Sequence, residues 1–165
     1  MQVPAHFSPA KEHLEGRVVL ITGAAGGIGS ELSRCCAAHG ATVILAGKKI
    51  PALEKLYDQI CQQSASEPVI YPVDLAGASP QDYATMADTI KDQLQGLDAV
   101  VHNAADFDGL RSLDHTEPNQ WLKSMQINLN APFLINQAVA PLLARSTQAR
   151  ILFTVDDQDL VSRAY

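Results

Sequence analysis

The chain has 165 residues, 47% hydrophobic and 18% charged, and this balance excludes wholesale disorder. Twelve Lys and Arg against 18 Asp and Glu give a net charge of −6, which argues against nonspecific nucleic-acid binding because such binding needs cations that neutralise phosphates. The length suits a single domain over residues 1–165, with residues 1–15 as an N-terminal extension. Three cysteines without metal-ligand spacing, no signal peptide and no membrane-length apolar run lead us to expect a cytoplasmic protein with no metal site and no membrane partner.

Short apolar runs alternate with segments of helical periodicity along the chain. The expected strands are 17–22, 41–46, 69–73, 99–102 and 150–155. The expected helices are 27–39, 51–63, 80–94 and 119–144. Ser79 is the predicted N-cap of the third helix, and residues 104–118 are expected to form a loop. The alternation predicts an α/β fold, with an open parallel Rossmann-type sheet of order 3-2-1-4-5 between two layers of helices.

A glycine-rich segment, TGAAGGIG at residues 22–29, lies between the first strand and the first helix. Gly23 is expected to form the tight turn, Gly27 to let the backbone approach a pyrophosphate, and Gly29 to let the helix pack close to the sheet. The free N–H groups at the start of the helix would face the anion. No Lys-Ser or Lys-Thr follows, which excludes a Walker-type triphosphate site. An ordinary strand-to-helix turn is the alternative, and the flanking strand and helix argue against it.

The spacing T-G-x-x-x-G-I-G resembles that of the short-chain dehydrogenase/reductase family, and further motifs follow in the family's order. These are Asp74-Leu75 after the third strand, His102-Asn103-Ala104-Ala105 after the fourth, and Asn128 in the long helix. The resemblance covers residues 16–165, and the His-Asn-Ala sequence with the Asn-x-Asn helix is similar to the YciK-like bacterial oxidoreductases. It implies an NAD(P)-dependent oxidoreductase that transfers hydride between nicotinamide and a small-molecule carbonyl or alcohol, and it leaves a homo-oligomer open.

The resemblance also implies which residues form the site. The expected cofactor-binding residues are Thr22, Gly23, Gly27, Ile28, Gly29, Lys48, Asp74, Leu75, Asn103 and Ala104. Within this set, the glycine loop would contact the pyrophosphate half of the cofactor, Asp74 the adenine ring and Asn103 the ribose region. Asn128 matches a member of the family's catalytic tetrad.

The charge at the end of the second strand bears on the choice of cofactor. An acidic residue there would bind the ribose 2′-OH of NAD, whereas a cation accommodates the 2′-phosphate of NADP. The strand ends in Gly47-Lys48-Lys49, and the next acid is Glu54. This favours NADP(H) over NAD. The alternative is that both lysines are simply solvated.

Pro132 falls inside the long predicted helix and has no N–H to donate to the carbonyl of residue 128, four positions earlier. In the family that Asn holds a water through its backbone carbonyl, in an irregular part of the helix. We therefore expect Pro132 to enforce an irregular turn that leaves the carbonyl of Asn128 available. A plain proline kink is the alternative.

The last residues depart from the family's pattern. Asp156 aligns with the catalytic Ser, the chain ends at Tyr165, and no Tyr-x-x-x-Lys segment is present. The chain is therefore expected to be truncated, which makes the fifth strand an edge and leaves apolar surface exposed. The alternative function is a degenerate dinucleotide-binding or interaction protein without catalysis. The loop carboxylates Asp106, Asp108 and Asp114 are interpreted as solvated, and the alternative is that the loop near them faces a substrate.

Overall fold

The computed structural model describes residues 9–107, 109 and 112–155 of the chain. The strands are β1 (Val18–Thr22), β2 (Thr42–Gly47), β3 (Val69–Pro72), β4 (Ala99–His102) and β5 (Arg150–Phe153). The helices are α1 (Gly27–Ala38), α2 (Ile50–Gln63), α3 (Pro80–Leu94), α4 (Pro118–Met125) and α5 (Ala131–Leu143), with a short 3-10 turn η1 (Leu113–His115) and a π-turn η2 (Gln126–Asn130). Most of these elements lie within one or two residues of the predicted ranges.

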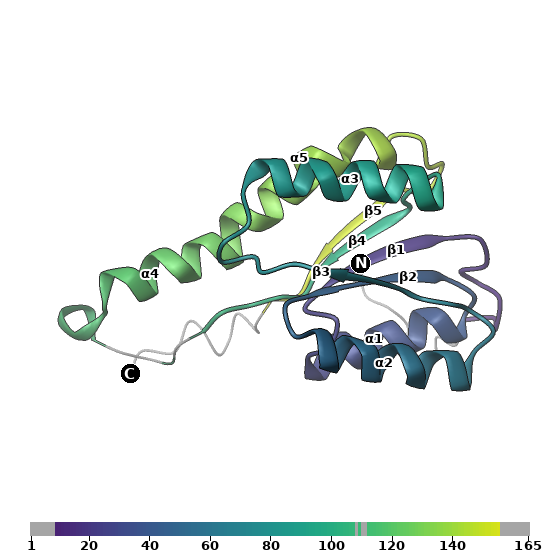
Figure 1. Cartoon of the computed structure of the whole chain (residues 1–165), viewed down its shortest axis with the longest axis horizontal. Coiled ribbons are helices and arrows are strands. Elements are labelled where there is room, and N and C mark those ends of the chain that lie inside the picture. Colours follow the sequence, from purple (N-terminus) through teal and green to yellow (C-terminus); the bar gives the residue numbers. More distant parts are fainter. Residues whose placement is uncertain (1–8, 108, 110–111, 156–165) are drawn as a thin grey trace.

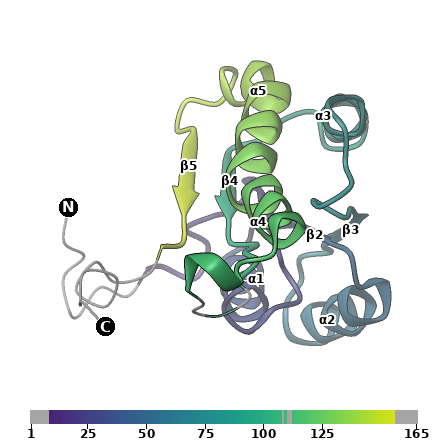
Figure 2. The ribbon, with the colours of Figure 1, turned by 90° about the vertical axis from the view of Figure 1, so that its left-hand side faces the viewer.

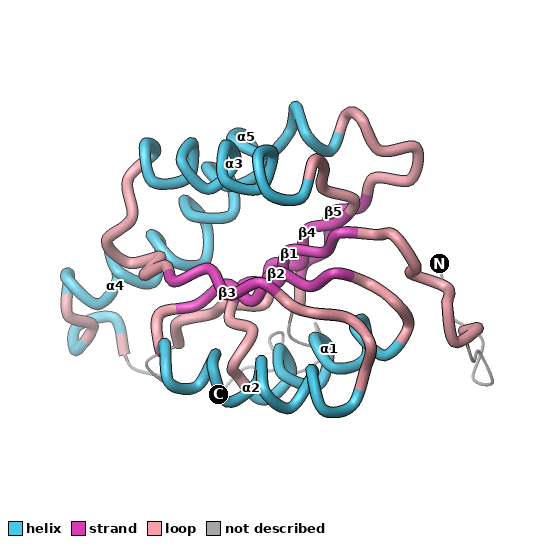
Figure 3. Tube along the Cα trace, turned by 45° about the vertical axis from the view of Figure 1, so that its right-hand side comes forward, coloured by secondary structure: helices cyan, strands magenta, loops and turns pink. Residues whose placement is uncertain are grey.

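The five strands form one parallel sheet in the order β3-β2-β1-β4-β5, which confirms the predicted topology (Figure 3). Helices α1 and α2 cover one face, and α3 and α5 cover the other (Figure 1). The chain moves outward from β1 to β3 on one side and then returns to β4 on the other side of β1. The strand order thus reverses between β1 and β4, where an open α/β sheet forms a ligand crevice at the carboxyl ends of its strands.

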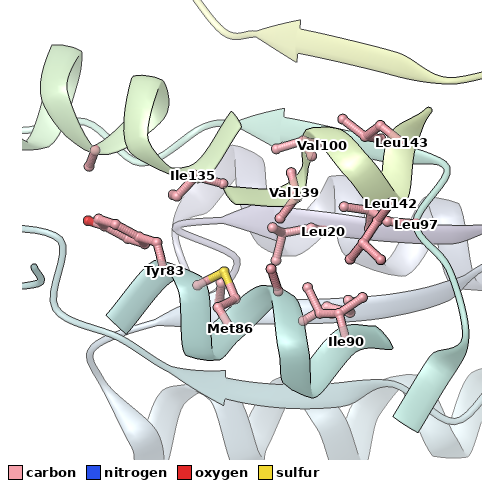
Figure 4. Close-up of a cluster of buried hydrophobic side chains, with 14 of the residues drawn as sticks. Leu20, Tyr83, Met86, Ile90, Leu97, Val100, Ile135, Val139, Leu142 and Leu143 are labelled. Carbon is pink, nitrogen blue, oxygen red and sulfur yellow. The ribbon is translucent and has the colours of Figure 1, made fainter. Parts of the chain in front are cut away.

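Two clusters of buried side chains hold the helix layers to the sheet. On the α3 and α5 face, Tyr83 and Met86 lie opposite Ile135 and Val139, with Leu20 of β1 between them (Figure 4). On the α1 and α2 face, the side chains of β1 and β2 that point toward these helices, such as Ile21, pack against one side of α2. That side of α2 carries Leu53, Leu56 and Ile60 at helical spacing. Because β1 and β2 are buried on both faces, they read as continuous apolar runs.

Helix α3 begins as the sequence predicts. The backbone N–H of Asp82 donates to Oγ of Ser79 at 3.4 Å, and the carboxylate of Asp82 accepts from the backbone N–H of Ser79 at 2.7 Å. This reciprocal pair is a capping box, and Pro80 occupies the first helical position, where no N–H is needed.

The predicted helix over 119–144 is divided in three. Helix α4 passes through the π-turn η2 into α5, and the backbone N–H of Ala131 donates to the carbonyl of Gln126, five residues earlier. Helices α4 and α5 follow one another in one continuous run of coil (Figure 1). Pro132, the second residue of α5, cannot donate to the carbonyl of Asn128. The expected irregularity next to Pro132 is confirmed, and it takes the form of an inserted residue, as in a π-bulge.

Among the described residues, β5 forms one edge of the sheet (Figure 2). Ile151, Leu152 and Phe153 are each about half exposed. No described helix of the chain is both long enough and apolar enough to span a bilayer.

Candidate functional site

The turn from β1 into α1 depends on close approach of two backbones. Gly23 has a φ of +63°, a conformation that favours glycine. A methyl group at Gly23 would lie 2.9 Å from Cα of Ala104, so the loop after β4 leaves no room for a side chain there. The predicted role of Gly23 in the tight turn is confirmed.

Gly29 lies behind this turn, on the side of α1 that faces the sheet. A methyl group at Gly29 would lie 2.7 Å from Nδ2 of Asn103 and closer still to the carbonyl oxygen of Gly23. Glycine at this position therefore lets the first turn of α1 pack on the ends of β1 and β4, as expected from the sequence.

Gly27 is the opposite case, because a methyl group there would meet nothing within 4 Å. It is the first residue of α1, and the neighbouring Ile28 is 68% exposed. The N-cap residue, Gly26, supplies no side-chain cap for the first N–H groups of the helix. Open space, uncapped N–H groups and the positive end of the helix dipole together form a candidate anion site.

Thr22 joins the ends of β1 and β4. Its hydroxyl accepts from the backbone N–H groups of Asn103 and Ala104, both at 3.1 Å, and donates to the carbonyl of Val101 at 3.4 Å. The side-chain amide of Asn103 donates to the carbonyls of Thr22 and Gly23 at 3.2 and 3.3 Å. These bonds fix the two strand ends that border the crevice.

A cleft of about 620 Å³ runs along this edge of the sheet, from the ends of β2 and β3 past the glycine loop to the loop after β4. It brings together nine of the predicted cofactor-binding residues: Thr22, Gly23, Gly27, Ile28, Lys48, Asp74, Leu75, Asn103 and Ala104. Gly29, buried behind the loop, does not line the cleft. The cleft is also lined by Asp106 and Ile127, which the sequence did not single out as cofactor-binding residues.

The β2 end of the cleft carries positive charge. Lys48 and Lys49 are both exposed there, and Lys49 is the residue that precedes the first turn of α2. Asp74, two residues after β3, also lines the cleft, and its carboxylate accepts from the backbone N–H of Ala76 at 3.2 Å. Two lysines, the N-terminus of α2 and the carboxylate of Asp74 therefore line this end of the cleft.

The side chain of Asn128 points away from the helix ladder and binds the loop after β4. Its Oδ1 accepts from the backbone N–H of Asp106, and its Nδ2 donates to the carbonyl of Asp106, both at 2.8 Å. The side-chain amide of Asn128 thus binds both backbone groups of Asp106, as the backbone of a neighbouring strand would. Its own backbone carbonyl has no α-helical donor, because residue 132 is proline.

The interpretation of Asp106 as a solvated carboxylate is wrong. Its side chain is only 19% exposed and accepts hydrogen bonds from the side chains of three α4 residues, Lys123, Gln120 and Ser124. The hydrogen bond from Lys123 is the main reason that the pKa of Asp106 is held below its usual value. Asp114 is exposed and pairs locally with His115 at 3.2 Å.

Three residues of the sequence argument lie outside the described residues: Asp108, Asp156 and Tyr165. Within residues 9–107, 109 and 112–155, no three His, Cys, Asp or Glu side chains come together in a way that could hold a metal ion.

The fold and the cleft define the class of protein. It is a doubly wound α/β protein whose glycine loop lies where the strand order reverses. The sequence profile of the short chain dehydrogenase family matches residues 17–161, and the chain belongs to this family.

Individual relatives agree with this assignment. The uncharacterized oxidoreductase YciK of Escherichia coli strain K12 is 33% identical over 149 residues, which cover 90% of this chain and 59% of YciK. The solved structure of E. coli YciK matches with a TM-score of 0.90 at 32% identity, covering 96% of this chain and 65% of that one. A short chain dehydrogenase from E. coli CFT073 complexed with NADPH matches with a TM-score of 0.89 at 33% identity, covering 94% and 65%. The chain therefore spans 59% to 65% of the length of these relatives.

Proposed function

We propose that the chain binds NADP(H) in this cleft, as part of an NAD(P)-dependent oxidoreductase that acts on a small carbonyl or alcohol compound. The glycine loop carries the proposal. Gly23 and Gly29 are packed against neighbouring atoms, whereas Gly27 is open at the uncapped start of α1. Gly23 and Gly29 thus build the turn, and Gly27 leaves room for a diphosphate. Dinucleotide binding needs both features.

The shape of the cleft suggests how the cofactor would lie. In doubly wound sheets the pyrophosphate sits at the helix after β1, and the adenosine half extends toward the end of β2. Lys48, Asp74 and Leu75 would then border the adenosine half. The nicotinamide half would lie on the opposite side of the loop, toward Asn103 and Ala104 at the end of β4, with Thr22 holding the two sides together.

Lys48 and Lys49 support a preference for NADP(H) over NAD. Both lysines line the end of the cleft where the ribose 2′ position would fall, at the N-terminus of α2. A 2′-phosphate would be stabilised by both, whereas an unmodified 2′-OH has no carboxylate acceptor at the end of β2. The E. coli relative complexed with NADPH supports binding of NADP(H) by this fold.

Bound NADPH would supply a hydride for reduction of a carbonyl carbon. The chain's own contribution to the reaction is Asn128. Its backbone carbonyl receives no α-helical hydrogen bond, because residue 132 is proline, and it would therefore orient a water molecule. A second candidate, dinucleotide binding without catalysis, is favoured by Asp156, because an ionised carboxylate cannot donate a hydrogen bond to a substrate carbonyl. Oxidation of NADPH in the presence of a panel of carbonyl compounds separates the two.

The binding proposal is tested by titrating the chain with NADPH and following nicotinamide fluorescence. We expect wild-type binding and at least about a tenfold loss in Gly27→Ala, equivalent to about 1.4 kcal/mol, because the added methyl group points into open space that the diphosphate would fill. A folded wild type that gives no signal at millimolar NADPH contradicts the proposal.

Cofactor preference is tested separately with Lys48→Asp, comparing the dissociation constants for NADPH and NADH. We expect the preference for NADPH to fall about tenfold or more, because a carboxylate repels the 2′-phosphate and can accept from a 2′-OH. Lys55→Asp is the matched control, since Lys55 is an exposed lysine of α2. An equal change in both variants would show that the effect is one of overall charge.

A further inference from the structure

Helix α4 is bound to the loop after β4 through one carboxylate. Nζ of Lys123 lies 2.7 Å from Oδ1 of Asp106, and Nε2 of Gln120 lies 2.9 Å from Oδ2. The hydroxyl of Ser124 lies 3.1 Å from Oδ2 and 3.2 Å from the carbonyl oxygen of the same residue. Three donors from two successive turns of α4 therefore converge on Asp106.

The backbone of Asp106 continues the same contact into the π-turn. Its N–H and carbonyl are both bonded to the side chain of Asn128, so its side chain and its main chain bind two consecutive helical segments. Helix α4 extends past the end of the sheet, away from the packed part of α5 (Figure 1). No residue of α4 is buried, so apolar packing contributes little to holding this helix in place.

Charge makes this contact stronger than an ordinary surface pair. The side chain of Asp106 is 19% exposed and that of Lys123 is 41% exposed. A carboxylate that accepts an ammonium donor together with neutral donors makes charge-assisted bonds, which are about twice as strong as neutral ones. Removing the carboxylate of Asp106 would remove these charge-assisted bonds at the point where the helix meets the loop.

The loop that Asp106 anchors is a wall of the cleft. Asn103, Ala104, Ala105 and Asp106 line its β4 end, together with Ile127 from the π-turn. This is the end that the nicotinamide half would occupy under the proposed function. The opposite end of the cleft, at Lys48 and Asp74, is formed by the residues that follow β2 and β3.

We propose that Asp106 is a positioning residue: it locks α4 and the π-turn onto the loop after β4 and thereby fixes the wall that receives the nicotinamide half of the cofactor. This inference rests on the proposed function. Asp106 does not itself contact the reacting atoms in this role. It acts through Asn128, Ile127 and the backbone of residues 103–105.

Two ligands separate this role from general stability. NADPH would fill the whole cleft, whereas adenosine 2′,5′-bisphosphate would fill only the β2 and β3 end. In Asp106→Ala we expect binding of NADPH to weaken about tenfold or more, the equivalent of about 1.4 kcal/mol, and binding of adenosine 2′,5′-bisphosphate to stay within about twofold of wild type. A variant that merely unfolds more easily would lose both ligands together.

Trp121, the single tryptophan of the chain, supplies a second readout because it lies on α4 and is 58% exposed. With NADPH bound, energy transfer from Trp121 to the reduced nicotinamide reports the distance between α4 and the cofactor. We expect this transfer at saturating NADPH to fall in Asp106→Ala. Asp114→Ala is the matched control, since that carboxylate belongs to the same connecting segment and pairs locally with His115.

Lys123→Met removes the cation from the other side of the contact and serves if Asp106→Ala does not fold. It should show the same selective loss of NADPH binding, and Asp106→Glu, which keeps the charge, should recover part of it. Unchanged NADPH affinity and energy transfer in a folded Asp106→Ala, or equal losses for both ligands, would overturn the role of Asp106. A wild type that binds neither ligand would instead overturn the proposed function, and this role with it.

Discussion

Thr22 and Asn103 are joined twice, through the backbone N–H of Asn103 to the Thr22 hydroxyl at 3.1 Å and through its side-chain amide to the Thr22 carbonyl at 3.2 Å. Thr22 ends β1 and Asn103 follows β4, so these bonds close the sheet at the point where its strand order reverses. The hydroxyl of Thr22 is buried and also accepts from the backbone N–H of Ala104.

Replacing Thr22 with Val keeps the shape of the side chain and removes the hydroxyl. Two backbone N–H groups, of Asn103 and Ala104, then lose their acceptor. We expect the free energy of unfolding in urea to fall by about 1–3 kcal/mol, the cost of leaving buried polar groups unpaired. Thr22→Ser keeps the hydroxyl and is the control. If the Val and Ser variants are equally stable, the hydrogen bonds of Thr22 contribute nothing.

The sequence predicts this part of the molecule well because its signals are local. The glycine spacing, the apolar runs and the Ser79 cap each lie within one element or one turn, and the structure places them as expected. The function of the site residues remains a prediction. The irregular turn at residues 126–130 could also be predicted, because a proline at position 132 lacks the backbone N–H that a regular helix would need there.

The contacts of Asp106 could not be predicted from the sequence, because they are not local. Its partners lie 14 to 22 residues away, on a helix that approaches the loop only in the folded chain. A lone Asp in a polar loop gives no sign that Lys123, Gln120 and Ser124 point toward it. Their spacing on one side of α4 was a usable signal, but many polar helix faces share it and face only solvent.

Gly29 and Gly27 lie two residues apart in the first turn of α1 and are expected to respond in opposite ways to the same added methyl group. Gly29→Ala forces atoms against the carbonyl oxygen of Gly23 and Nδ2 of Asn103, so we expect the free energy of unfolding to fall by about 1–3 kcal/mol. Gly27→Ala meets no atom within 4 Å and should stay near wild-type stability. Thermal unfolding of the two variants side by side checks this. Equal stability would contradict the packing described for Gly29.

Asp98 is expected to hold the other end of the sheet together. Its carboxylate accepts from the backbone N–H of Val18 at 2.9 Å, from Arg17 at 2.9 Å and from the hydroxyl of Ser146 at 2.6 Å. Burial raises the pKa of Asp98, but these hydrogen bonds outweigh it and leave the pKa below its usual value. Asp98 therefore contributes stability above its unfolded pKa of 3.8, and this contribution is lost as the pH falls through the lower folded pKa.

Asp98→Asn removes the charge and turns an amide donor toward groups that also donate. At neutral pH we expect a loss of about 1.5–3 kcal/mol in the free energy of unfolding, the typical worth of hydrogen bonds to a charged group. Asp58→Asn, at an exposed position of α2, is the control for the loss of one negative charge. Similar stabilities for the two variants would mean that the contacts of Asp98 carry no net energy.

His102 gives the fold a dependence on pH that is separate from the carboxylates. The side chain is 4% exposed, its Nε2 lies 2.8 Å from Oδ1 of Asn136, and its ring stacks on Phe153 with centroids 4.8 Å apart. Burial lowers the pKa of His102 from its usual 6.5, and the bond to Asn136 only partly opposes this. The neutral ring with the proton on Nε2 satisfies Asn136 as an acceptor.

Because the folded chain binds this proton less tightly than the unfolded chain, acid favours unfolding. The contribution of the neutral His102 to the free energy of unfolding is complete above pH 6.5. It is lost progressively as the pH falls from there toward the lowered pKa of His102 in the folded state. We expect urea midpoints measured between pH 7.5 and about pH 5 to decline in wild type. His102→Asn, which cannot titrate, should show a shallower decline over the same range even if it is less stable throughout. Parallel pH profiles for the two chains would show that protonation of His102 is not what destabilises the fold.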